Sequence, residues 1–549
     1  MIKRVVLLLL FIRQLVALKI LIVSFAGAGH VTPIFELTKA LNHHQITFVT
    51  QKFAQDYVDL RGYVASNPSF NLIYTNDLPE IAEKEKLIEQ TSIDYMMEHS
   101  LIEAIGQIGT MVSELTIPLL NRTIHLLMIE KFDVIIGGAM IIGLERICEI
   151  AKTPCVFHKP ALVNNLFGLN TPNTLALLDE NDLRYFPYRA YNLIFNCRVI
   201  MKMFSKIVKL ISETYPRLPR IPGPFVDVFN WKNLFQSNPK YLLLISAPTS
   251  FYPFSTIDPS VKYLGGFIDP MMEKSSHDEL LHWIQSKPNS SIIYGAFGSS
   301  SVISAVRMSS LIRGLARFLI EKQSSFLLLA FRSVNYETYR SVINELLDQE
   351  SMRTVWNDAS RVRIENGFVP QKWILRHSSV HIFLTHAGFG SLSESIYFEK
   401  ATLCMPFNMD QFANAIRIRN LNLGRSLFEP PSLWKSLKKP YHHIDYRFTE
   451  IDVSSHLSIL WLNQTYQRAN QLMSSEMKYL GGVQQAVKEI EYYHEFSGSF
   501  DRFIPLTTTL KFYQQYFLDL ISFFLILPLS IFLFLSVRCC KQNRKEKTD

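Results

Sequence analysis

The feature that most constrains the fold of this chain is an apolar strand that ends in a glycine turn, well into its second half. Residues 382–385 read Ile-Phe-Leu-Thr, and residues 386–390 read His-Ala-Gly-Phe-Gly. A short apolar run that breaks at glycine is typical of a buried strand. Ser391 and Glu394 then stand at the spacing of a capping box, which predicts a helix N-terminus. A strand, a glycine turn and a helix N-terminus in this order predict a cradle for an anion.

A second apolar strand follows that helix at residues 403–407. Asp410 and Gln411 come just past its carboxyl end, where α/β sheets place their ligand contacts. A single Ser-x-x-Glu is usually only a helix cap, and a single Asp-Gln pair is usually a solvated loop. The two in one block therefore indicate a binding site more strongly than either does alone.

The amino-terminal part repeats the alternation of strand and helix. Residues 19–24 and 46–50 are apolar strands, and Thr32 followed by Pro33 predicts a helix start between them. The chain therefore opens as a β-α-β unit, half of a Rossmann-like domain. Residues 242–245 end this first half as its last strand.

The glycines of the first turn invite a dinucleotide-binding interpretation, which fails on two counts. Gly27 and Gly29 begin the fingerprint, but Thr32 stands where its third glycine is needed. Residues 47–52 also lack the acidic residue that binds the ribose. A nicotinamide-dependent dehydrogenase is therefore disfavoured.

A second set of strands and helices begins near residue 291. Residues 291–294 and 325–331 are strands, and the first of them leads into Gly-Ala-Phe-Gly-Ser-Ser. The apolar residues between Met308 and Leu319 recur at helical spacing. Residues 453–493 are predicted to be helical and to pack back across the first half. The predicted fold is α/β, with two Rossmann-like domains.

The block from Phe368 to Ala415 resembles the signature of the UDP-dependent glycosyltransferases, and the resemblance extends over nearly the whole chain. It implies two Rossmann-like β/α/β domains of the GT-B type, with the UDP-sugar bound by the second. The residues that match UDP-sugar contacts of that family are Ser299, Phe368, Gln371, His386, Gly388, Gly390, Ser391, Glu394, Asp410 and Gln411.

The resemblance also implies a role for each matched residue. Phe368 takes the place of the aromatic under the uracil, usually Trp, and Gln371 lies beside the uridine, while Glu394 takes the ribose hydroxyls. His386, Gly388, Ser391 and the serine turn that holds Ser299 contact the diphosphate. Asp410 and Gln411 hold the sugar, and Gly390 stands where plant members usually carry Asn.

His30 matches the general base of the family, although a turn histidine is by default a surface residue or a cap. A neutral imidazole takes the proton of an acceptor hydroxyl as that oxygen attacks the sugar. Many members orient this histidine with an aspartate after a later strand. Gly138 stands at that place here, and Asp133 lies at the start of the strand instead. Histidine alone serves in some sterol-glycosylating relatives.

Composition limits the other classes of function. The chain has 549 residues, too many for one core, and 48% of them are hydrophobic, which is consistent with membrane segments. Its net charge of +8 is modest and no basic stripe appears, so nucleic acid is not an expected partner. The six cysteines include no Cys-x-x-Cys pair or other ligand spacing, so no metal site is predicted.

Both ends of the chain carry membrane-directed signals. Lys3 and Arg4 before an apolar run at residues 5–12 predict a secretory signal peptide, and the alternative is a first buried strand. Residues 520–537 are uncharged and long enough to span a bilayer, and the basic tail after them predicts a cytosolic C-terminus. Lys545 and Lys547 resemble a dilysine signal for retrieval to the endoplasmic reticulum.

These signals predict a single-pass type I protein of the endoplasmic reticulum membrane with a lumenal body. Its predicted parts are a signal peptide at 1–18, an acceptor-binding domain at 19–255, a UDP-sugar-binding domain at 256–500, a juxtamembrane segment at 501–519, a transmembrane helix at 520–537 and a cytosolic tail at 538–549. Asn121, Asn289 and Asn463 each begin a glycosylation sequon.

The function that these features predict is inverting, metal-independent transfer of glucuronate or glucose from a UDP-sugar to a hydroxyl of a small lipophilic acceptor. The UDP-sugar is a substrate, and no cofactor is expected. The alternative is a weakly active or inactive UDP-sugar-binding membrane protein, which Gly138 and Gly390 motivate. The sequence permits a homo-oligomer without predicting one.

Overall fold

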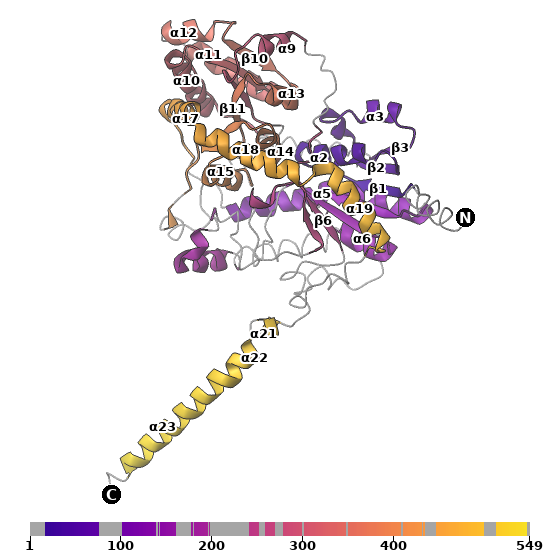
Figure 1. Ribbon diagram of the computed structural model, residues 1–549, viewed down its shortest axis with the longest axis vertical. Coiled ribbons are helices and arrows are strands. Elements are labelled where there is room, and N and C mark those ends of the chain that lie inside the picture. The colour runs from indigo at the N-terminus through magenta and orange to yellow at the C-terminus, as the bar shows by residue number, and fades with distance from the viewer. Residues whose placement is uncertain are drawn as a thin grey trace, which may run out of the picture.

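The computed structural model places two parallel β-sheets side by side, one from each half of the chain (Figure 1). We describe residues 17–75, 101–138, 141, 143–160, 177–178, 181–195, 197, 241–251, 259–269, 278–298, 301–346, 350–407, 410–430, 432–433, 446–498, 512–515 and 517–545. Most of the predicted signal peptide, together with Ser299 and Lys547, lies outside them.

The first sheet has seven strands in the order β3-β2-β1-β4-β5-β6-β7, and every neighbouring pair is parallel. Its strands are β1 (Lys19–Val23), β2 (Gln45–Gln51), β3 (Phe70–Thr75), β4 (Val134–Gly138), β5 (Cys155–Lys159), β6 (Leu242–Ile245) and β7 (Val261–Tyr263). Nearly continuous apolar runs form them, because helices cover both faces of a parallel sheet.

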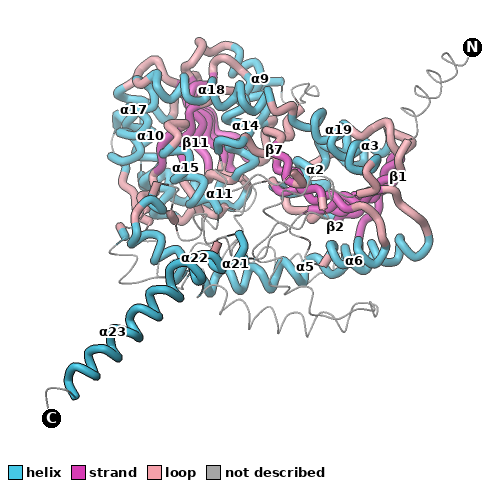
Figure 2. The backbone as a smooth tube through the Cα atoms, turned by 60° about the horizontal axis from the view of Figure 1, so that its bottom comes forward, coloured by secondary structure: helices cyan, strands magenta, loops and turns pink. Residues whose placement is uncertain are grey.

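The helices of this unit divide between the two faces. They are α2 (Ala28–Ala40), α3 (Leu60–Ser66), α5 (Leu101–Ile129) and α6 (Leu144–Ala151), with short 3₁₀ turns at Lys52–Asp56, Asp182–Arg184 and Thr249–Phe251. α2 packs on the face formed by Ile20, Ile22, Val134, Ile136, Val156 and Leu244. α5 and α6 cover the other face, as Figure 2 shows, against Leu21, Val23, Ile135 and Phe157.

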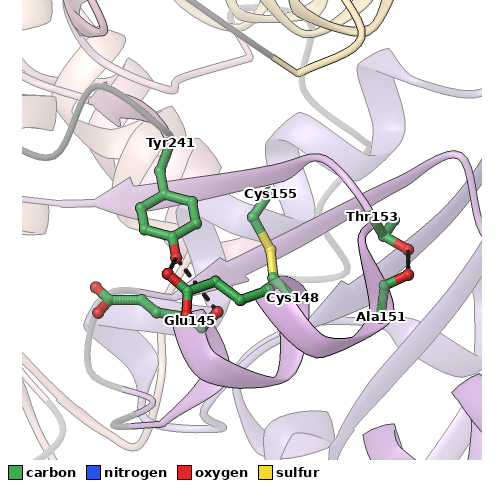
Figure 3. Close-up of a disulfide and its surroundings, with 7 residues drawn as sticks. Glu145, Cys148, Ala151, Thr153, Cys155 and Tyr241 are labelled. Atoms are coloured by element: carbon green, nitrogen blue, oxygen red, sulfur yellow. Dashed lines mark hydrogen bonds between the residues drawn. A yellow bond between two sulfur atoms is a disulfide. The ribbon is translucent and has the colours of Figure 1, made fainter. Parts of the chain in front are cut away.

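A disulfide between Cys148 and Cys155 ties the end of α6 to the first residue of β5 (Figure 3). Beside it, the Tyr241 hydroxyl donates a hydrogen bond to Glu149 Oε1 at 2.9 Å. Disulfides persist in oxidising compartments, so this one agrees with the lumenal body that the sequence predicts.

The second sheet has six strands in the order β10-β9-β8-β11-β12-β13, again all parallel. They are β8 (Ile292–Ala296), β9 (Phe326–Phe331), β10 (Val362–Asn366), β11 (Val380–Thr385), β12 (Ala401–Cys404) and β13 (Gly424–Ser426). Its helices are α9 (Asp278–Gln285), α10 (Ala305–Glu321), α11 (Ser333–Leu346), α12 (Glu350–Trp356), α13 (Gln371–Arg376), α14 (Phe389–Tyr397) and α15 (Asp410–Asn420).

Three helices connect the second unit back to the first. α17 (Glu450–Leu462) packs on α10, α18 (Gln464–Tyr479) packs on α14, and α19 (Gly482–Glu495) reaches α2 (Figure 1). Ala486, Ile490 and Tyr493 of α19 belong to the core of the first sheet. The predicted return of this segment across the first half is therefore confirmed. The predicted domain boundary at residue 255 falls before β7, which pairs with β6 in the first sheet.

Two predicted helix starts are wrong. α2 begins at Ala28 with Gly27 as its N-cap, so Thr32 and Pro33 lie inside it. The reason is that the Gly27 carbonyl already accepts the Val31 N–H at 2.9 Å, which closes the first turn before Pro33. α14 likewise begins at Phe389, with Gly388 as its N-cap and no capping side chain.

The C-terminal helix extends away from the body (Figure 1). Residues Leu518–Val537 are long and apolar enough to cross a membrane, and their side chains are exposed. The helix consists of α22 (Leu518–Ile521), a π-helical segment at Ser522–Ile526 and α23 (Leu527–Lys545), and α21 (Phe512–Gln515) precedes it. The π segment lies just before Pro528, where the missing N–H and the proline ring disturb the α-helical ladder.

Candidate functional site

His30 lies in the first turn of α2, just past the carboxyl end of β1. The edge of its ring contacts Phe25, with the ring centroids 5.8 Å apart. Burial lowers the pKa of His30 to about 4, so its imidazole is neutral at physiological pH. A neutral imidazole is the form that accepts a proton.

The residue at the family's aspartate place, Gly138, ends β4. Among the described residues, a Cβ added there would meet only Ile34 Cδ1, at 3.7 Å, so they leave space for a side chain. In register beside Gly138, on β5, lies His158, a fully buried histidine that the sequence analysis missed. Its signal in the sequence was a polar residue near the end of an apolar strand.

His386 follows β11 in the second unit and is enclosed by glycines. A Cβ at Gly298, whose φ is +72°, would lie 2.5 Å from the His386 ring, and one at Gly388 would lie 2.3 Å from its Nε2. Only glycine therefore lets these two turns close around the imidazole. Nδ1 of His386 lies 3.1 Å from the Thr385 hydroxyl, and burial lowers its pKa to about 4.

The turn after His386 is held in a conformation that is rare for a residue with a side chain. Ala387 has a φ of +66°, and its carbonyl accepts a hydrogen bond from Asn414 Nδ2 at 3.1 Å. Such local strain is typical of ligand-binding turns. α14 starts directly after the turn, so its N-terminal N–H groups lie where the sequence predicts an anion cradle.

Gln371, Ser391 and Glu394 form one hydrogen-bonded cluster. Gln371 Nε2 donates to Glu394 Oε2 at 2.7 Å and contacts the Ser391 hydroxyl at 3.2 Å. The predicted capping box is therefore wrong: Glu394 lies in the second turn of α14 and is occupied by Gln371. Burial raises the pKa of Glu394, and the positive charge of Lys372 opposes that rise.

Phe368 and Lys372 bring this cluster to the first unit. Phe368 is 55% exposed, and the edge of its ring meets Tyr57 with the centroids 6.0 Å apart. Lys372 forms an ion pair with Glu36 of α2, which Lys39 also contacts at 2.7 Å. Helix α2, which carries His30, is thus tied by charge to the helix that carries Gln371. Sequence reasoning missed this link, because 336 residues separate its partners.

Asp410 and Gln411 begin α15 at the carboxyl edge of the second sheet. Burial raises the pKa of Asp410 to about 6, although Asn414 Nδ2 donates to its carboxylate at 3.0 Å. Gln411 Oε1 accepts the Phe407 N–H at 2.8 Å. At Gly390 no described residue lies within 4 Å of where a Cβ would stand, so the described residues leave the place of the plant asparagine open.

Among the described residues, one group has the composition of a metal site. His43, His44 and Glu491 lie together where α19 meets the turn after α2, with Glu491 Oε1 at 2.9 Å and 3.3 Å from the two Nε2 atoms. However, the Leu18 N–H donates to His44 Nδ1 at 3.1 Å, which places the proton of a neutral ring on Nε2. A protonated nitrogen does not ligate a metal. We therefore interpret the group as polar contacts between Glu491 and the two imidazoles.

Comparison with known proteins agrees with this geometry. Residues 249–430 match the family model described as "UDP-glucoronosyl and UDP-glucosyl transferase". UDP-glucuronosyltransferase 3A1 of Xenopus laevis is 22% identical over 519 residues, which are 92% of this chain and 90% of that protein. UDP-glucuronosyltransferase 3A2 of Mus musculus is 24% identical over 430 residues, 75% of this chain and 74% of that protein.

Solved structures show the same fold. A Phytolacca americana enzyme, titled "UGT2 complexed with UDP-2fluoro-glucose and pterostilbene", has a TM-score of 0.56 at 15% identity, over 87% of this chain and 100% of that one. CalG4, the calicheamicin glycosyltransferase, has a TM-score of 0.55 at 16% identity, over 88% and 99% of the two chains. The two units thus have the GT-B fold, as predicted. Within that class, the chain is similar to the UDP-glycosyltransferase family, whose model matches residues 249–430.

Proposed function

We propose that this protein transfers a hexosyl group, glucuronate or glucose, from a UDP-sugar to a hydroxyl of a small lipophilic acceptor. One observation carries the proposal. A neutral histidine at the carboxyl edge of one sheet and a prearranged polar cluster at the carboxyl edge of the other lie on helices joined by the Glu36–Lys372 ion pair. Names of similar proteins support the donor class, and the pterostilbene complex of one neighbour supports a small aromatic acceptor.

In the proposed mechanism, His30 removes the proton of the acceptor hydroxyl as its oxygen attacks the anomeric carbon. The new carbon–oxygen bond forms while the bond to UDP breaks, and UDP leaves with that electron pair. The proton stays on the His30 imidazole. Attack from the face opposite UDP inverts the anomeric configuration.

The chain's own groups would stabilise the leaving diphosphate. The N-terminal N–H groups of α14 point a helix dipole at it, and His386 and Gly388 border the same turn. Phe368 would stack on the uracil, Gln371 would lie beside it, and Glu394 would accept the ribose hydroxyls. Asp410 and Gln411 would hold the sugar. This arrangement needs no metal ion in the proposed mechanism.

A second candidate function is UDP-sugar binding with little or no transfer. Gly138 favours it, because the described residues place no carboxylate at this position to stabilise the imidazolium that forms on His30. Gly390 also favours it, because it leaves open space where plant members place an amide beside the sugar.

We also propose that the body lies in the lumen of the endoplasmic reticulum. The span at Leu518–Val537, the basic residues after it and the Cys148–Cys155 disulfide support this topology. Asn289 and Asn463 are exposed at helix and strand boundaries, so they are the expected glycan sites. Replacing Lys545 and Lys547 with Ser should leave insertion intact and release the protein to later compartments.

The decisive experiment incubates the full-length protein in detergent with a panel of UDP-sugars and lipophilic aglycones, with and without EDTA. Mass spectrometry of the products identifies the sugar, and the anomeric coupling in their NMR spectra gives the stereochemistry. A β-glycoside from an α-linked donor, formed equally with EDTA, is the expected result. UDP-sugar binding without transfer or hydrolysis across the panel would favour the second candidate.

A further inference from the structure

The α2 face of the first sheet ends in a row of three residues on neighbouring strands. Side chains alternate between faces along a strand, so Gly138, His158 and Ser246 face the same side as Ile136, Val156 and Leu244 of the core under α2. Gly138 and His158 are partners in register. The strand beside the missing aspartate thus supplies an imidazole to the same face.

The hydrogen bonds of His158 indicate which of its ring nitrogens carries the proton. Nε2 lies 3.0 Å from the Ser246 hydroxyl, and that hydroxyl donates to the Pro160 carbonyl at 3.3 Å. A serine has one proton to donate, so both contacts are satisfied together only when Nε2–H is the donor to Ser246. Nδ1 then carries a lone pair, and it is buried with no partner among the described residues.

Burying an acceptor without a partner costs free energy, so such an atom calls for an explanation. His158 is 1% exposed and its ring stacks on Phe267, with the centroids 5.1 Å apart and the planes at 23°. Packing therefore fixes the ring in place. A rigid, buried imidazole with one free lone pair is suited to accept a hydrogen bond.

His30 is a candidate donor that the fold offers. It lies one helical turn before Ile34, hence on the same side of α2, and Ile34 Cδ1 is 3.7 Å from the place of a Gly138 Cβ. The two imidazoles interact electrostatically. Burial, and after it the charge of a protonated His30, lowers the pKa of His158 to about 3, so His158 stays neutral throughout.

We propose that His158 replaces the absent carboxylate as the positioning residue of His30. Its Nδ1 accepts the N–H of the His30 ring through one bridging water, and this turns the other, unprotonated nitrogen of His30 toward the acceptor hydroxyl. The inference rests on the proposed function. A neutral partner orients the base without adding a negative charge, and this agrees with the low pKa of His30.

Two amide variants test the roles of the two ring nitrogens of His158 separately. His158→Asn keeps an acceptor oxygen near the place of Nδ1, whereas His158→Gln keeps a donor toward Ser246 and loses the acceptor. In the full-length protein we expect His158→Gln to lower kcat by roughly 10- to 100-fold, less than the full contribution of a general base because His30 itself remains. His158→Asn should stay within a few-fold of wild type, and KM for the UDP-sugar should stay unchanged in both. His44 is a buried histidine just before β2, at the amino edge of the same sheet. His44→Gln therefore controls for damage to the core.

A rescue gives the sharper test. Gly138→Asp, for which the space is open, should restore activity in the His158→Gln protein and move the acid limb of kcat/KM to higher pH, because a carboxylate raises the pKa of His30. Equal losses in both amide variants, with equal losses in Tm and no rescue, would overturn the proposal.

Failure of the proposed function can be told apart from failure of this inference. If the wild-type protein forms no glycoside with any donor, the reaction of His30 with diethyl pyrocarbonate, followed by peptide mass spectrometry, still reports its protonation. The inference predicts that Gly138→Asp raises the pH midpoint of this reaction and that His158→Gln changes its rate. A rate and midpoint unchanged in both variants would contradict it.

Discussion

The carboxyl edges of the two sheets differ in how completely their site residues contact one another. In the second unit, Gln371, Ser391 and Glu394 already contact one another, and glycines enclose His386. In the first unit, His30 has no carboxylate at Gly138, and it interacts electrostatically with a second imidazole, His158. In the proposed mechanism, the donor half is therefore preorganised for one ligand class, whereas the acceptor half keeps the base and supports it with His158.

This contrast follows from what each edge must recognise. A UDP group presents the same ring, ribose and diphosphate to every enzyme that uses it, so a fixed set of hydrogen bonds serves. Acceptors differ in shape and polarity, and an apolar pocket with one base can serve many of them. Variants at each edge should therefore change different measured quantities.

The largest expected effect is at His30. His30→Ala should lower kcat by roughly two to four powers of ten, the usual contribution of a general base. UDP affinity, measured by calorimetry, should stay nearly unchanged, because the matched UDP contacts lie on the second unit. Near-normal turnover in the variant would show that His30 is not the general base. The two edges would then not differ in the way described above.

At the carboxyl edge of the second sheet, a substitution should instead change the affinity for UDP. Glu394→Gln should weaken UDP binding by up to about 3 kcal/mol, the scale of a hydrogen bond to a charged group. The Tm should change little, since Glu394 does not cap α14 and the amide keeps a contact to Gln371. An unchanged UDP affinity would show that this cluster is structural.

The third prediction concerns stability at Asp410. Its folded pKa of about 6 lies above the usual value of 3.8, so ionisation is harder in the folded state and the charge destabilises the fold at neutral pH. Asp410→Asn should therefore raise the free energy of unfolding at pH 7–8 by about 1–3 kcal/mol. The gain should shrink as the pH falls through 6 and vanish below about 4. Urea unfolding at several pH values measures it, and a gain that is constant with pH would contradict the prediction.

The smallest effect is expected at the link between the units. Lys372 lowers the raised pKa of Glu394, so Lys372→Met should raise that pKa further. UDP binding should then weaken a few-fold more at pH 6 than at pH 8, because more of Glu394 is protonated. Lys39→Met is the matched control, since Lys39 shares Glu36 but is not among the charges that shift Glu394. Identical pH profiles of UDP binding in the two variants would exclude coupling through Lys372.

Much of this protein was determined by local sequence. The apolar runs at β1, β8, β9 and β11 predict buried parallel strands, and the spacing from Phe368 to Gln411 indicates the donor half of the fold. The helix starts predicted at Thr32 and Ser391 are wrong. Side-chain capping patterns predict helix N-termini there, but the carbonyls of Gly27 and Gly388 close the first turns earlier.

Tertiary structure alone decided what supports each site residue. His158 reaches the His30 site only because β5 pairs with β4 in register, and Ser246 fixes its tautomer from 88 residues away. The Glu36–Lys372 pair likewise depends on how α2 meets α13. A local pattern records the strand, the turn and the helix, since these depend on neighbouring residues. Which side chains meet across strands and units depends on register and docking, to which distant parts of the chain contribute together.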